Sequence, residues 1–238
     1  IFDEKLLQPA DAVEAYGRAV ELNPRNFGAM DALERIHGAE TRWEDCIEIK
    51  NKRVQALEDP RQKIQVLLDI AKMCSEKLEA PAQAILPFTQ IIRLDPLHDF
   101  AFSQLEALYR GQARFAELIE LYVARVEASE SVDERVRLLR KVALVNEKDM
   151  GDKAQAFDAL LLAWTQDFTN DESARELERI AGLTQRWNEV LHVANQSLQD
   201  VAADDVATRN AICLKCARWY AREGHPDYAI PFLQQVLT

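Results

Sequence analysis

LERIHGAETRWEDC, residues 33–46, has the pattern of a helix end, a turn and the start of a second helix, and the chain repeats this pattern twice. Residues 105–118 read LEALYRGQARFAEL, and residues 177–190 read LERIAGLTQRWNEV. The three copies begin at residues 33, 105 and 177, so the period is 72 residues. A fixed period of this length is typical of stacked supersecondary units rather than of a single globule.

The same period holds in other parts of the sequence. Alanine recurs at Ala12, Ala84 and Ala156, and a large residue follows each one four positions later, as Tyr16, Phe88 and Leu160. A third column holds the aromatic residues Trp43, Phe115 and Trp187, which we expect to pack into the turns. Beside them recur Glu34 with Arg42, Glu106 with Arg114 and Glu178 with Arg186, for which we predict salt bridges across the turns.

Composition favours helices throughout. The 238 residues are 48% hydrophobic and include only 7 Gly and 8 Pro, while Ala, Leu, Glu, Arg and Gln are abundant. Apolar residues recur at helical spacing, and no alternating strand pattern is present. No apolar run approaches the roughly 20 residues that span a bilayer, so we expect no membrane segment. The first residue is Ile and both ends read as helix, so we expect a piece of a longer protein.

Each 72-residue unit divides into two helical hairpins, and the hairpins carry a recognisable pattern. The first set of residues is Ala12, Tyr16, Ala19, Leu22 and Pro24; the second is Ala84, Phe88, Ile91, Leu94 and Pro96. This pattern resembles the tetratricopeptide repeat, in which a small residue allows close helix approach, an aromatic residue fills the gap and proline ends the helix. The resemblance covers nearly the whole chain. It is weaker where Cys46, Leu118 and Val190 replace the small alanine, and where Phe168 replaces proline.

The resemblance implies an all-α, right-handed solenoid of antiparallel helix hairpins, about six to seven in number. We expect one continuous array over residues 1–238, with units at 12–83, 84–155 and 156–228 and partial units at 1–11 and 229–238. Proteins of this kind act as interaction scaffolds, because a stacked array offers an extended binding surface. We therefore predict a partner that is a protein or peptide.

Charge and cysteine content narrow the possibilities. The net charge of −11 disfavours nucleic acid as the main ligand. The four cysteines (Cys46, Cys74, Cys213 and Cys216) are too sparse for a disulfide framework, and they favour a reducing, cytoplasmic compartment. Cys213 and Cys216 have the spacing of a metal or redox pair but lack a second pair. They also fall in columns that hold Leu139 and Val142 in the preceding unit, so we expect them in the core.

No motif indicates an enzyme. The sequence has no phosphate-binding loop, no dinucleotide fingerprint and no HExxH, and its four histidines are scattered. We therefore predict no catalytic residue, no cofactor and no metal site.

The tetratricopeptide resemblance implies that the first helix of each hairpin lines a concave groove. Laid on this sequence, the groove columns hold seven basic residues and no acidic one from residue 110 onward: Arg110, Lys141, Lys148, Arg175, Arg179, Lys215 and Arg222. Trp219 lies in the same columns, as a candidate stacking or cation–π neighbour. These residues predict a basic groove that binds an acidic segment or a C-terminal carboxylate through charge-assisted hydrogen bonds.

Other interpretations stay open at this point. The basic side chains could be solvated or paired with Glu172, Asp149 or Glu223 nearby. The chain could be a regulatory arm of a larger multidomain enzyme, or a structural repeat protein that self-associates through its ends. RNA binding is disfavoured by the net charge.

Overall fold

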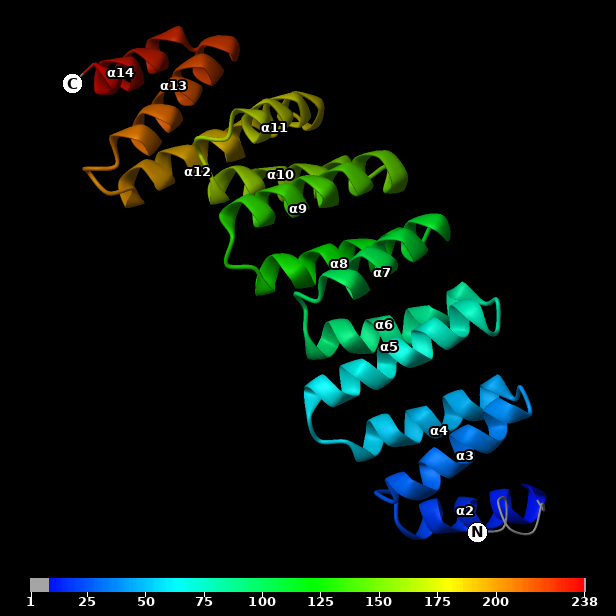
Figure 1. Cartoon of the computed structure of the whole chain (residues 1–238). Helices are drawn as coiled ribbons and strands as arrows, with labels where there is room; N and C mark the ends of the chain where they lie inside the picture. The colour runs from blue at the N-terminus through cyan, green and yellow to red at the C-terminus, as the bar shows by residue number, and fades with distance from the viewer. Residues whose placement is uncertain (1–8, 238) are drawn as a thin grey trace. The chain divides into compact units, whose positions relative to one another are not determined.

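Residues 9–237 of the computed structural model form thirteen α-helices, and this part of the chain contains no strand (Figure 1). Helices that are consecutive in sequence pack against one another, so the predicted all-α helical-repeat class is confirmed. The chain divides into two compact units, Ile1–Ala113 and Arg114–Thr238, which are described separately. Their boundary falls in the turn of the second quoted copy, residues 105–118. The handedness of the array and its continuity over the whole chain stay predictions.

The first unit contains six α-helices among its described residues, with one short 3-10 helix. Their bounds are α2 (Pro9–Leu22), α3 (Phe27–Ala39), α4 (Trp43–Ala56), α5 (Pro60–Glu76), η1 (Pro81–Ala84), α6 (Ile85–Leu94) and α7 (Asp99–Gly111). Asp59 caps α5 by accepting a hydrogen bond from the Arg61 N–H, and Pro60 occupies the first turn as predicted. Each helix therefore begins where its capping residue allows.

The second unit contains seven α-helices and one π-helical turn. Their bounds are α8 (Phe115–Ala128), α9 (Val132–Val145), η2 (Asn146–Met150), α10 (Lys153–Gln166), α11 (Asp171–Thr184), α12 (Trp187–Asp200), α13 (Val206–Arg222) and α14 (Pro226–Val236). Ser131, Asp152, Asn170 and Asp205 accept N-terminal backbone hydrogen bonds of α9, α10, α11 and α13. Gly151 adopts a φ of 71° and ends the π-helical turn, which lengthens α9 by one more turn.

The quoted stretches form the predicted helix–turn–helix segments, and the turns share a backbone conformation that the sequence does not reveal. Thr41, Ala113 and Gln185 occupy one column of the 72-residue repeat and have φ angles of 58°, 54° and 59°. None of them is glycine, although the left-handed region favours glycine. The turn shape is therefore a property of the repeat, and three different side chains accept the same strained backbone.

The turns at 23–25, 95–97 and 167–169 explain why the third unit tolerates Phe168 in place of proline. Asn23, Asp95 and Asp167 each accept a hydrogen bond from the backbone N–H two residues later. This side-chain turn directs the chain without proline. Phe168 instead packs edge-on against Trp164, with ring centroids 4.8 Å apart.

The repeat columns predicted from the sequence are packing columns. Ala12, Ala84 and Ala156 are fully buried, as the close approach of two helices requires. Cys46, Leu118 and Val190, which replace alanine in the alternate helices, are buried as well. Trp43 and Trp187 lie in van der Waals range of Gly38 and Gly182, five residues earlier in each turn. The tryptophans therefore fill the space that a glycine leaves.

The predicted salt bridges across the turns are wrong for the first and third copies. Glu34 pairs with Lys50 and Arg53 of α4. Glu178 pairs with Arg218 and Arg222 of α13. In both cases the carboxylate reaches a neighbouring helix rather than the arginine of its own turn, because the helix faces place those cations closer.

Candidate protein-interaction surface

Ion pairs join α9 to α11 in the second unit. Arg140 of α9 donates to Glu172 over 2.7 Å and to both carboxylate oxygens of Glu176 over 2.8 and 2.9 Å. Arg179 of α11 donates to the two oxygens of Glu147 over 2.7 and 2.5 Å. Two-pronged arginine–carboxylate pairs fix orientation as well as distance. They therefore hold the first helices of neighbouring hairpins in a defined register.

A second group of polar contacts joins α11 to α13. Lys215 lies 3.0 Å from Asp171 and donates to the backbone oxygen of Phe168 over 3.2 Å. Arg218 and Arg222 both donate to Glu178, the former over 2.5 Å. The same faces that carry the predicted basic residues therefore also carry their counter-charges.

These contacts decide how the predicted groove residues stand. Arg179, Lys215 and Arg222 are engaged with carboxylates of this chain. Lys141 lies over the Tyr122 ring, 5.3 Å from its centroid. Lys148 and Arg175 are exposed on the surface of the second unit. Arg110 is exposed on α7 and belongs to the other unit.

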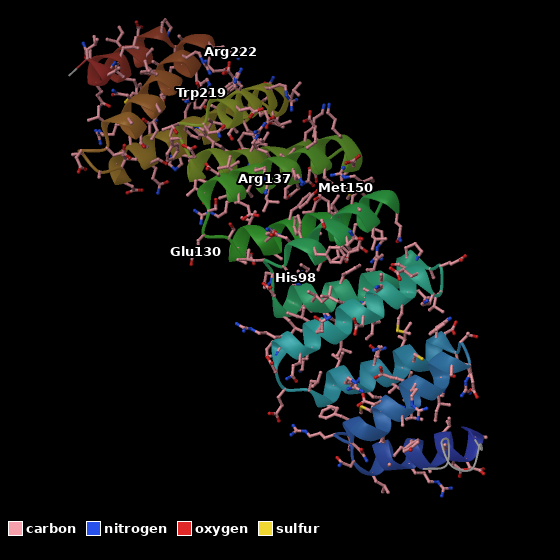
Figure 2. All side chains as sticks on the ribbon, in the orientation of Figure 1. His98, Glu130, Arg137, Met150, Trp219 and Arg222 are labelled. Carbon is pink, nitrogen blue, oxygen red and sulfur yellow. The ribbon has the colours of Figure 1, made fainter. Side chains whose placement is uncertain are left out.

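Two of the predicted residues are buried, and the predicted role of Trp219 is corrected. Trp219 is 0% exposed and packs against Trp164 and Trp187, with centroid distances of 5.2 and 6.2 Å. It is a core residue, because an indole enclosed by two others has no face left for a ligand. Lys215 is also buried, with its amine directed to Phe168 and Asp171. Figure 2 shows Trp219 and Arg222 on the same helix, α13.

A pocket of about 270 Å³ lies between α9 and α11, where some of the cations remain accessible. Four cationic residues line it, Arg137, Arg140, Lys141 and Arg179, together with the carboxylates of Glu147 and Glu176. Arg137, labelled in Figure 2, has a side chain 66% exposed and its ion-pair contact to Glu134 is 3.6 Å long. Leu160 and Ala143 supply apolar lining. Four cations against two carboxylates leave the lining with an excess positive charge of two.

The electrostatics of this pocket keep its charges fixed at neutral pH. Hydrogen bonding from Arg179 holds the pKa of Glu147 below its usual range, although burial acts in the opposite direction. Hydrogen bonds to Glu176 and Glu172 raise the pKa of Arg140. Both charges therefore persist, and the pocket offers fixed cationic donors rather than a proton-transfer pair.

The first unit has a hollow of a different character between α5 and α7. It measures about 490 Å³, and Phe88 and Leu68 form part of its lining. Phe100 contacts Phe88 edge-on at 5.9 Å and stays 55% exposed. Gln65, Asp69, Glu76 and Gln104 add polar and acidic groups to the wall. An exposed aromatic beside amide groups is the composition of protein-binding surfaces.

Sequence reasoning missed Arg137, Arg140 and Phe100. Arg137 and Arg140 flank the predicted column at Lys141, and the hydrophobic spacing of α9 alone does not distinguish them from other solvated charges. Phe100 follows an Asp-Pro turn by four residues. A large apolar residue at this exposed first-turn position was the available signal.

Neither surface carries chemistry that indicates a reaction. Among residues 9–237, no three His, Cys, Asp or Glu side chains lie close enough together to hold a metal ion. In the same residues, no helix has the length and hydropathy needed to cross a membrane. Cys213 and Cys216 are buried, which confirms their placement in core columns.

Comparison with known proteins adds no further identification. No family model matches this chain, and no curated protein matches its sequence.

Proposed function

We propose that this chain is a non-catalytic protein-interaction scaffold of tetratricopeptide-like hairpins, and that it binds the carboxylates of an acidic segment or chain terminus. The observation that carries the proposal is the pocket between α9 and α11. Its lining has an excess of cations in a chain whose net charge is −11. Such local excess attracts an anionic partner, while the acidic remainder of the surface disfavours polyanions such as nucleic acid.

The arrangement of the cations supports carboxylate binding in particular. Arg140 and Arg179 already hold carboxylates of this chain in two-pronged geometry. Arg137 has only the 3.6 Å contact to Glu134, so its guanidinium retains donors for a ligand. A ligand carboxylate beside Arg137 and Lys141 would extend the existing alternation of charges. We therefore expect one or two carboxylates to be recognised at this pocket.

The hollow of the first unit supports the same class of function. Phe100 is an exposed aromatic anchor, and anchors of this kind contribute most of the energy of many protein interfaces. Its acidic wall residues, Asp69 and Glu76, favour a different partner segment from that of the cationic pocket. A scaffold with two unlike contact surfaces fits an interaction module better than an enzyme.

The test is a binding titration with a labelled peptide of alternating Glu and Gly residues, followed by fluorescence anisotropy. The variant is Arg137→Glu with Lys141→Glu, and we expect its affinity to fall at least about tenfold. Reversal at Arg179 is less informative, because it would leave Glu147 facing a second carboxylate. The matched control is Arg18→Glu with Lys52→Glu, which makes the same change in net charge on the other unit.

The outcomes separate local recognition from general electrostatics. Equal weakening in both double variants would show a net-charge effect and would reject the pocket. Unchanged affinity in the pocket variant, with helicity preserved by circular dichroism, would reject carboxylate recognition there. An amidated peptide with Gln in place of Glu should bind neither the wild type nor the variants.

A further inference from the structure

The C-terminal helix α14 has two unlike faces. Ala229 is buried, and Tyr228 and Phe232 contact the Tyr220 ring of α13 with centroid distances of 5.7 and 5.6 Å. Ile230 and Leu233 lie on another stripe of the helix, three residues apart, and no helix among residues 9–237 follows α14 to cover them. Leu237 continues the same stripe one turn later. The stripe is therefore apolar and solvent-exposed.

The repeat shows that this exposure is exceptional for these positions. Ala229 corresponds to Ala156 of α10, so Ile230 corresponds to Phe157 and Leu233 to Leu160. Phe157 is 0% and Leu160 is 2% exposed, whereas Ile230 is 50% and Leu233 is 45% exposed. The columns that form the core in α10 are thus open in α14. Large apolar side chains at such positions mark a contact surface.

The earlier units show what kind of element covers these columns. In α10, the helix packs against α9 on one side and α11 on the other. In α6, Phe88 of the same column as Leu233 contacts Phe100 of α7. A helix from the following hairpin therefore completes the core at each earlier position. The surface of α14 has the shape and chemistry to receive one more helix.

We infer that a second copy of this chain occupies this surface, with the two α14 helices packed antiparallel about a twofold axis. An antiparallel pair places Leu233 against Leu233 and Ile230 beside Leu237 of the other copy, so one stripe serves both sides. The stripe carries no charge, and Asp227 is the one charged residue of α14. Each chain has a net charge of −11, which opposes contact through most other surfaces. The uncharged stripe is the face on which two copies meet with least repulsion.

The size of the stripe sets the expected strength. One face of an 11-residue helix is a small interface, so we expect a reversible dimer with a dissociation constant on the order of 10 μM. This association is independent of the carboxylate pocket, because α14 contributes no residue to that pocket. It should also resist added salt, because apolar burial is not screened.

The test is sedimentation equilibrium over concentrations on both sides of about 10 μM. We expect the mass of the wild type to rise with concentration, and we expect Ile230→Glu with Leu233→Glu to raise the dissociation constant at least about tenfold. The matched control is Leu162→Glu on α10, whose side chain is 47% exposed but lies outside the stripe. It should associate as the wild type does. A wild type that stays monomeric, or a double variant that associates unchanged, would overturn the proposal.

A second measurement does not depend on the folding of the charged variant. Leu233→Cys should form an interchain disulfide under mild oxidation, because the twofold axis brings the two thiols together. The four natural cysteines are buried and should not compete. Leu162→Cys is the control and should give no cross-link. Failure of the Leu233→Cys variant to cross-link above control would contradict the antiparallel arrangement.

Discussion

The indole N–H of Trp219 donates to Glu178 Oε2 over 3.3 Å, so a core residue of α13 is tied to a carboxylate of α11. Arg218 and Arg222 donate to the same carboxylate, whose side chain is mostly buried. A carboxylate with three donors from one neighbouring helix positions that helix both along and around its axis. The basic residues near Trp219 therefore belong to the internal structure of the second unit.

Removal of this carboxylate should destabilise the second unit. Glu178→Ala leaves the buried indole N–H without an acceptor and two guanidinium groups without their counter-charge, so we expect a loss of about 2–3 kcal/mol in the free energy of unfolding. Urea denaturation followed by tryptophan fluorescence measures it. Glu189→Ala is the control, because Glu189 pairs with Arg186 of its own first turn and should leave the midpoint nearly unchanged. Equal effects of the two substitutions would contradict the special role of Glu178.

The left-handed turn column provides a stabilising prediction. Gln185→Gly should raise the free energy of unfolding by about 0.5–1 kcal/mol, because glycine relieves the positive φ of 59° at more benefit than it adds chain entropy. Thr41→Gly should act in the same direction in the first unit. The control is Gln185→Ala, which keeps the Cβ and should not stabilise. Thermal unfolding measures all three, and a gain from alanine equal to that from glycine would reject backbone strain as the cause.

The sequence predicted the helical-repeat fold because the repeat and the helix both follow from local chemistry. The columns at Ala12, Ala84 and Ala156 are spaced by the repeat, and burial of an alanine has one simple meaning, the close approach of two helices. The left-handed residues Thr41, Ala113 and Gln185 fall on the same period. Their side chains have nothing in common, so the shared backbone conformation was not legible from residue types.

The site was predicted less well, because its charges are balanced by residues about 32 positions away in the sequence. Arg179 pairs with Glu147, and Arg140 pairs with Glu172 and Glu176. A column of cations read along one helix at a time omits the carboxylates that neighbouring helices bring to it. Trp219 illustrates the same point: its position on the helix was read as inward to a groove, whereas three-dimensional packing places it in an aromatic cluster.

The Arg179–Glu147 pair predicts a dependence of stability on pH. The folded protein holds the pKa of Glu147 below its ordinary value, chiefly through the hydrogen bond from Arg179. The pair therefore stabilises the fold above about pH 4.3 and loses this contribution as the pH falls through the folded pKa. Arg179→Ala should lower the free energy of unfolding at pH 7 by about 1–3 kcal/mol, since it strands a carboxylate that is mostly buried.

The comparison that tests this pair is between pH 7 and pH 3. The deficit of Arg179→Ala should shrink at pH 3, where Glu147 is protonated in the variant and weakly paired in the wild type. Arg175→Ala is the matched control on the same helix, because Arg175 is exposed and bonds to the backbone oxygen of Asp171. Chemical denaturation at both pH values gives the four free energies. A deficit that is the same at both would assign the effect to packing of the arginine stem.

The paired cysteines of α13 should be chemically inert in the folded protein. Burial raises the pKa of Cys216 to about 12, and burial also raises the pKa of Cys213, whose thiol contacts Gln235 at 3.2 Å. Because the thiolate is the reactive form, we expect neither residue to react with iodoacetamide at pH 8 until the chain unfolds. Mass spectrometry of native and urea-unfolded samples measures the labelling, with the unfolded sample as the control for reagent activity. Rapid native labelling of both thiols, or binding of one zinc ion per chain, would contradict their role as core residues and would restore the metal or redox interpretation of Cys213 and Cys216.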